Sequence, residues 1–161
     1  MTISHEQLLS RIHYDPDTGV FTRLVKTSAF ARLGVTKGNP RGNGYRGLSV
    51  GGREYYLHRL AWFYVYGEWP RHVIDHVNGD RTDNRLCNLR DVPQAANLQN
   101  IHNARSCSST GLLGAFRWRG KFRSDIRVDG RKRHLGVFDT AEAAHQAYVA
   151  AKRMYHPAST L

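Results

Sequence analysis

Residues 73–100 read VIDHVNGDRTDNRLCNLRDVPQAANLQN, and the spacing of the polar residues in this segment predicts the architecture around it. A short apolar strand ends in Asp75 and His76, and an Asn-Gly pair then turns the chain back. Asn88 falls on the returning extended piece, and Asn97 falls on a helix that follows a proline. The order predicts two antiparallel strands and a helix that bring these polar side chains to one point.

The residue types in this segment suit the hydrolysis of a phosphodiester. A neutral imidazole takes a proton from water near pH 7. A carboxylate and an amide oxygen are hard ligands that suit Mg²⁺ or Mn²⁺, and a metal bound by them relieves charge on a phosphate. A second amide can hold the imidazole in one tautomer. The sequence therefore indicates a metal-assisted hydrolytic site.

Some of these residues have simpler explanations. Asp75 and Asn78 could cap a turn, and Asn84 competes with Asn88 for the structural role. We favour Asn88 because it lies between apolar positions 86 and 89, as a residue on a packed strand should. His58 could be a second active-site imidazole, but we interpret it as a buried histidine at a helix start.

Together with HRLAW at residues 58–62, this segment resembles the His-Asn-His endonuclease motif in its His-Asn-Asn form, the ββα-metal fold of phage homing endonucleases. The resemblance covers about residues 45–103. It implies that His76 is the general base and that Asp75 and Asn97 bind the metal. It also implies that Asn88 braces the hairpin and orients His76. Asn97 stands where many relatives have His, which argues against tight zinc binding.

The basic residues gather further along the chain. The net charge of the chain is +11, and residues 101–135 hold nine basic and two acidic residues. A charge of this size indicates a polyanionic partner, most often nucleic acid.

Residues 111–161 show a second pattern, with strands expected at 113–118, 121–128 and 131–138 and a helix at 141–155. Asp129-Gly130 predicts a hairpin turn between the last two strands. Alternation along the middle strand places Lys121, Arg123 and Arg127 on one face. We expect the sheet to pack its apolar face on the helix and to present a basic face that fits a DNA major groove.

This stretch resembles the ethylene-response-factor (Apetala-type) DNA-binding domain, in the words STGLLGAFRWRGKFRSDIRV and HLGVFDTAEAAHQAYVAA. The resemblance implies double-stranded DNA as the partner. Trp118 either stacks on a base or sugar or packs in the small core. The expected DNA-contacting residues are Arg117, Trp118, Arg119, Arg123, Arg127, Arg131 and Arg133.

Length and composition exclude several classes of protein. A chain of 161 residues holds one domain or two small modules. No apolar run is long enough to span a membrane, and no signal-peptide pattern opens the sequence, so we expect a cytoplasmic location. The resemblance to phage endonucleases implies that the cell is a bacterial host. Cys87 and Cys107 stand apart, which argues against a disulfide scaffold and a thiolate zinc site. The oligomeric state stays open.

We therefore expect an α+β protein in four segments: an N-terminal β-rich segment (1–44), a nuclease module (45–104), a linker (105–110) and a DNA-binding module (111–161). The expected function is that of a metal-dependent DNA endonuclease of the homing type. The main alternative is a non-catalytic, sequence-specific DNA-binding regulator whose nuclease module has decayed. A weaker alternative is an RNA-binding or structural basic protein.

Overall fold

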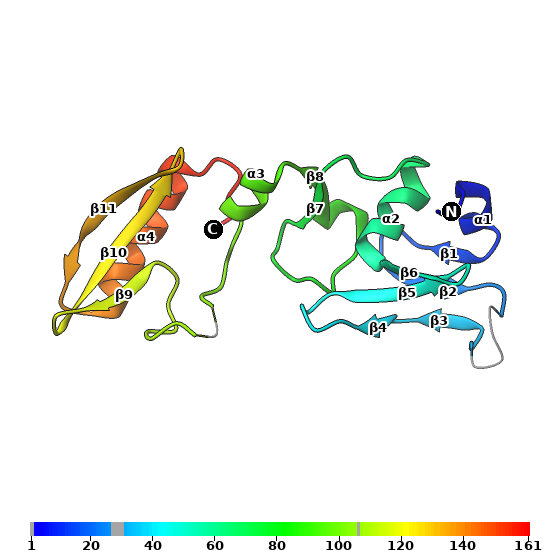
Figure 1. The fold of residues 1–161 in the computed structure, drawn as a ribbon, viewed down its shortest axis with the longest axis horizontal. Helices are drawn as coiled ribbons and strands as arrows, with labels where there is room; N and C mark the ends of the chain where they lie inside the picture. The colour runs from blue at the N-terminus through cyan, green and yellow to red at the C-terminus, as the bar shows by residue number, and fades with distance from the viewer. Residues whose placement is uncertain (1, 27–30, 106) are drawn as a thin grey trace. The chain divides into compact units, whose positions relative to one another are not determined.

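The computed structural model describes residues 2–26, 31–105 and 107–161. The chain divides into two compact units, Met1–Pro93 and Gln94–Leu161 (Figure 1). Both contain helices and antiparallel strands, as expected for an α+β protein. No helix within the described residues combines the length and the apolar character that crossing a bilayer requires.

The first unit contains α1 (His5–Leu9), β1 (Ile12–Tyr14), β2 (Phe21–Arg23), β3 (Gly34–Thr36), β4 (Asn39–Pro40), β5 (Arg46–Val50), β6 (Arg53–Tyr56), α2 (Leu57–Tyr66), β7 (Val73–His76), the 3₁₀ turn η1 (Leu86–Asn88) and β8 (Leu89–Val92). The second unit contains α3 (Gln94–Gln99), β9 (Ala115–Trp118), β10 (Lys121–Val128), β11 (Arg131–Phe138) and α4 (Ala141–Tyr155).

The first unit is built from small antiparallel sheets around one apolar core. Strands β1–β2–β3 and β4–β5–β6 form two three-stranded sheets, and β7 pairs with β8. A hairpin turn at Gly51-Gly52 joins β5 to β6, with both glycines at positive φ. Helix α2 buries Leu60 and Ala61 completely in the core and ends at Gly67, which adopts the left-handed conformation typical of a helix C-terminus.

Two elements of the first half differ from expectation. The leucine spacing predicts a helix over residues 1–12, but α1 spans only His5–Leu9, and Ile12 pairs with Arg23 in a sheet. The extended piece expected from position 86 begins as the turn η1 before β8. Pairing with the next strand overrides the local pattern at Ile12, and a hydrogen bond from the Leu86 N–H to the Pro16 carbonyl accompanies the turn at η1.

The second unit matches the predicted order of three strands and a helix. The sheet has the order β11–β10–β9, and α4 runs along one of its faces (Figure 1). Ile126 and Ala151 are buried between sheet and helix, with Tyr148 packed against them. Thr140 caps α4 by accepting a hydrogen bond from the Ala143 N–H, which satisfies one of the free donors of the first turn.

The residues that follow helix α3 form hydrogen bonds with α4 and with the C-terminal end of the chain. The helix is shorter than the predicted one, which extended to about residue 103. Asn100 Oδ1 accepts hydrogen bonds from the N–H and the hydroxyl of Thr160 (3.1 and 2.8 Å). Lys152, a buried residue of α4, donates to the Ile101 carbonyl, and burial lowers its pKa to about 8. The predicted linker at 105–110 therefore lies within the second unit.

Candidate active site

Strand β7 ends with Asp75 and His76, which are only 6% and 3% exposed. Pairing with β8 places Asp75 opposite Arg90 and His76 opposite Leu89. The Arg90 guanidinium donates to Oδ2 of Asp75 through Nε (2.8 Å) and Nη2 (2.7 Å). A buried carboxylate needs such compensation, since an unpaired charge in the interior is costly. Both residues that the sequence singled out here therefore lie at the buried end of β7.

The His76 ring meets Asn84. Nε2 of His76 lies 3.4 Å from Oδ1 of Asn84, and the Asn84 amide donates through Nδ2 to the Thr82 carbonyl. This second bond orients the amide so that its oxygen faces the imidazole. An amide oxygen only accepts, so the contact favours the tautomer with its proton on Nε2 and its lone pair on Nδ1.

Asn88 has the bracing role but not the orienting one. Its Oδ1 accepts from the Asn78 N–H (2.9 Å), and its Nδ2 donates to the Asp83 carbonyl (2.8 Å). These two bonds close both ends of the loop between β7 and η1. The sequence favoured Asn88 as the residue that orients His76, whereas the amide that meets His76 Nε2 is that of Asn84. The two roles expected of one asparagine are thus divided between two.

Burial favours the neutral form of His76. It lowers the pKa of the imidazole below its usual 6.5, against the opposing effects of the Asn84 contact and of the neighbouring Asp75 carboxylate. A neutral imidazole is the form that accepts a proton, so this environment suits a general base.

An N-terminal segment supports the loop that carries Asn84, a contact that no pattern in the sequence predicts. The Tyr14 hydroxyl donates to the Asn84 carbonyl (2.7 Å), and the Leu86 N–H donates to the Pro16 carbonyl (2.9 Å). Gly19 (φ +72°) closes this turn, and a Cβ there would lie 2.6 Å from the Arg85 nitrogen. These contacts join residues about 70 positions apart in the chain.

Gly19→Ala is therefore expected to disturb the site as well as the fold. The new methyl group would push the Asn84–Arg85 backbone, and we expect a loss of about 2–4 kcal/mol in unfolding free energy, from backbone strain and overpacking together. Cleavage by the folded protein should fall about tenfold, because Asn84 moves relative to His76. Urea unfolding and single-turnover cleavage measure the two effects.

Gly52→Ala is the matched control, because Gly52 also has a positive φ (+78°) but no atom within 4 Å of an added Cβ. It should show the backbone strain alone and an unchanged cleavage rate. Equal losses of unfolding free energy and of cleavage rate in the two variants would show that the contact between Gly19 and the Asn84 loop does not matter.

Asn97, the other residue expected to bind metal, lies on α3 in the second unit. The described part of the chain has no group of three or more His, Cys, Asp or Glu side chains able to hold a metal ion. Asp75 and Asn97 would offer such a metal one carboxylate oxygen and one amide oxygen. Such an all-oxygen set fits Mg²⁺ or Mn²⁺ and does not fit zinc.

The sheet of the second unit presents a basic and aromatic face away from α4. Pairing of Arg123 with Phe116, and of Arg127 with Lys132, places these side chains on one face. Trp118 is 44% exposed, with the guanidinium carbons of Arg119 and Arg123 each 5.3 Å from its ring centre. Trp118 is therefore a surface residue of this face and does not belong to the core. A shallow groove of about 350 Å³ runs between these side chains.

Three of the expected DNA-contacting arginines belong to the opposite side of the sheet by register. Arg117 pairs with Phe122, Arg131 with Val128, and Arg133 with the buried Ile126. The Arg133 guanidinium lies 4.8 Å from the ring centre of Tyr155 in α4. Because side chains alternate along a strand, these residues cannot share a face with Arg123 and Arg127.

A buried carboxylate organises the basic face. Asp125 is 8% exposed and contacts Arg123 (2.9 Å), Lys132 (3.0 Å) and His134 (3.0 Å). Burial raises its pKa, but the hydrogen bonds from Arg123, His134 and Lys132 outweigh this effect and lower the pKa to about 2. Asp125 therefore stays charged and holds three side chains on the outer face.

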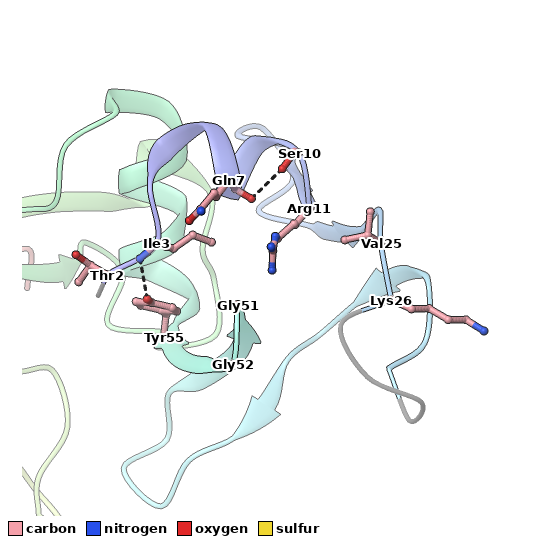
Figure 2. Close-up of a pocket in the computed structure, with 10 residues that line it drawn as sticks. All are labelled: Thr2, Ile3, Gln7, Ser10, Arg11, Val25, Lys26, Gly51, Gly52 and Tyr55. Atoms are coloured by element: carbon pink, nitrogen blue, oxygen red, sulfur yellow. Dashed lines mark hydrogen bonds between the residues drawn. The ribbon is translucent and has the colours of Figure 1, made fainter.

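A hollow of about 700 Å³ in the first unit is lined by none of the candidate catalytic or metal-binding residues. It lies between α1, the Gly51-Gly52 turn and the Val25-Lys26 segment (Figure 2). Arg11 points into it, whereas Lys26 points away (Figure 2). None of its lining residues is a predicted site residue, so the candidate chemistry remains with Asp75 and His76.

Comparison with known proteins identifies the segment that carries these residues. Residues 55–99 match the family model described as HNH endonuclease. This segment is therefore similar to an HNH endonuclease domain. No curated relative matches the chain at a significant level. A solved structure described as showing DNA binding and cleavage by the HNH homing endonuclease I-HmuI is similar, with a TM-score of 0.46 and 18% identity over 98% of this chain and 95% of that one.

The match is to an endonuclease family, and an endonuclease is a phosphodiester hydrolase; it covers residues 55–99 of the chain. The matched residues run from β6 to the end of α3. The HNH domain thus contains each of the four residues for which the sequence predicted a catalytic or metal-binding role, as well as Asn84.

Proposed function

We propose that this protein is a homing-type, metal-dependent endonuclease that hydrolyses phosphodiester bonds in duplex DNA, with His76 as the general base. The observation that carries the proposal is the buried, neutral imidazole of His76, held by Asn84 beside the Asp75 carboxylate within the HNH domain. A base of this kind matches the first requirement of the reaction, the removal of a proton from the attacking water.

In this mechanism His76 accepts the proton of the water as it attacks phosphorus, and Asn84 keeps the ring in the tautomer that leaves Nδ1 able to accept it. Asp75 and Asn97 would hold a divalent cation through one carboxylate and one amide oxygen. When bound, the cation supplies charge stabilisation at the phosphate and at the departing oxygen. Asn88 keeps the loop between β7 and η1 closed, which maintains the positions of Asn84 and His76.

The outer face of β9–β11 is our candidate for the DNA contact. Arg123 and Arg127 supply positive charge there, and Trp118 supplies an exposed ring that can stack on a base or sugar. Because Asp75 and His76 are almost fully buried, the binding of duplex DNA must open access to them.

The test is incubation of the full chain with supercoiled plasmid. We expect conversion to nicked or linear DNA with Mg²⁺ or Mn²⁺ and no conversion with EDTA. Binding of duplex DNA without cleavage under any of these metals would favour the regulator with a decayed nuclease module. Equal affinity for RNA and duplex DNA at matched salt would favour a general basic protein instead.

A further inference from the structure

His58, which the proposed mechanism does not use, lies directly against the proposed base. It occupies the first turn of α2 and is 6% exposed. Its ring centre is 5.3 Å from that of His76, with the two planes at 82°. This is the edge-to-face arrangement that aromatic rings favour.

The surroundings of His58 are themselves aromatic. Tyr56 stacks on it at 5.4 Å, and Tyr45 packs at 4.8 Å. Tyr45 also lies 5.8 Å from the His76 ring and carries the Arg81 guanidinium on its face. His58 and Tyr45 thus pack against both each other and His76.

The contact matters because a histidine ring turns easily about its last torsion. That torsion joins an sp³ carbon to an sp² carbon and has broad energy wells, so neighbours must set the plane of the ring. The Asn84 contact, at 3.4 Å, is near the long limit for a hydrogen bond and constrains the plane weakly. Packing by His58 and Tyr45 adds a constraint on the plane of the same ring.

His58 acts through its shape. Its Nδ1 is buried with no hydrogen-bond partner among the described residues. Burial, with smaller contributions from His76 and Arg59, lowers the pKa of the imidazole to about 3, so the ring is neutral at physiological pH. A neutral ring beside His76 adds no charge that would oppose protonation of the base.

We propose that His58 is a positioning residue whose ring, packed edge to face against His76, fixes the plane in which His76 accepts the proton. The inference rests on the proposed function, because it assumes that His76 is the base. The proposal predicts that an aromatic ring at position 58 is sufficient to hold the plane of the His76 ring. Cleavage should not require a nitrogen at that position.

The experiment compares His58→Phe and His58→Ala in the full chain. His58→Phe keeps the ring and removes the buried unpaired nitrogen, so single-turnover cleavage should stay within about threefold of wild type. His58→Ala frees the His76 ring, and the rate on bound DNA should fall about 10- to 100-fold with the DNA dissociation constant unchanged. A long-range ¹H–¹⁵N spectrum of the imidazoles should show one His76 tautomer in wild type and His58→Phe, and averaging in His58→Ala.

Phe63→Ala separates positioning from general loss of packing. Phe63 is a buried ring on the same helix and stacks on Trp69, away from His76. It should lower the melting temperature at least as much as His58→Ala does, yet keep the cleavage rate and the His76 spectrum of wild type. The proposal is overturned if His58→Phe is as slow as His58→Ala, or if the His76 spectrum is the same in all variants. Absence of cleavage by wild type would overturn the proposed function alone, since the spectrum still reports on His76.

Discussion

His76→Ala is expected to lower the cleavage rate by about 10²–10⁴-fold, the usual contribution of a positioned general base. The affinity for duplex DNA should stay near that of wild type, because His76 is buried and contributes no charge to the surface. Single-turnover cleavage of a labelled duplex gives the rate, and a gel shift in EDTA gives the affinity without cleavage.

The neighbouring imidazole does not replace the lost base. Although His58 lies 5.3 Å away, burial lowers its pKa to about 3, which makes it a far weaker base than an ordinary histidine. The residual rate of His76→Ala should therefore not be rescued by raising the pH to neutrality and above.

His72→Ala is the matched control for this variant. His72 precedes β7 and is exposed, and its Nδ1 lies 3.5 Å from the Asp91 carboxylate. Removal of this imidazole should leave both cleavage and binding unchanged. A wild-type rate in His76→Ala, or a comparable loss in His72→Ala, would contradict the assignment of the base.

Local signals explain why much of the C-terminal sheet and its packed helix could be predicted from the sequence. β10, β11 and α4 have the expected bounds, since the Asp129-Gly130 turn and the Thr140 cap lie next to the elements that they delimit. In the first unit, by contrast, Ile12 continues a helical pattern but pairs with Arg23. A strand partner supplied by another part of the chain is not visible in a local pattern.

The difference between local signals and contacts from other parts of the chain also applies to the candidate site. Asp75 and His76 are adjacent in sequence at the end of an apolar strand, so a local pattern was enough to identify both as candidates. The choice between Asn84 and Asn88 depended on which amide faces the imidazole. That orientation is set by Thr82 and by a segment near Tyr14, far away in sequence. Spacing alone could therefore identify the candidates but could not assign their roles.

The second large effect is expected on duplex DNA binding, and it follows from the register of the C-terminal sheet. The double variant Arg123→Ala/Arg127→Ala should weaken duplex DNA binding about 100-fold at about 0.1 M salt, because it removes two cations from the outer face beside Trp118. The slope of log affinity against log salt should also fall by about 2, since each lost phosphate contact accounts for about 0.9. Fluorescence anisotropy over a salt series measures both quantities.

The variant should remain folded, because Asp125 keeps Lys132 and His134 as partners when Arg123 is gone. Arg131→Ala/Arg133→Ala removes the same charge from the same sheet, but from positions in register with Val128 and Ile126 on the side that faces α4. Long-range attraction falls equally in both double variants, so the difference between them isolates direct contact. If the two lose affinity equally, the protein reads DNA through its overall charge, and the outer face of β9–β11 is not the contact surface.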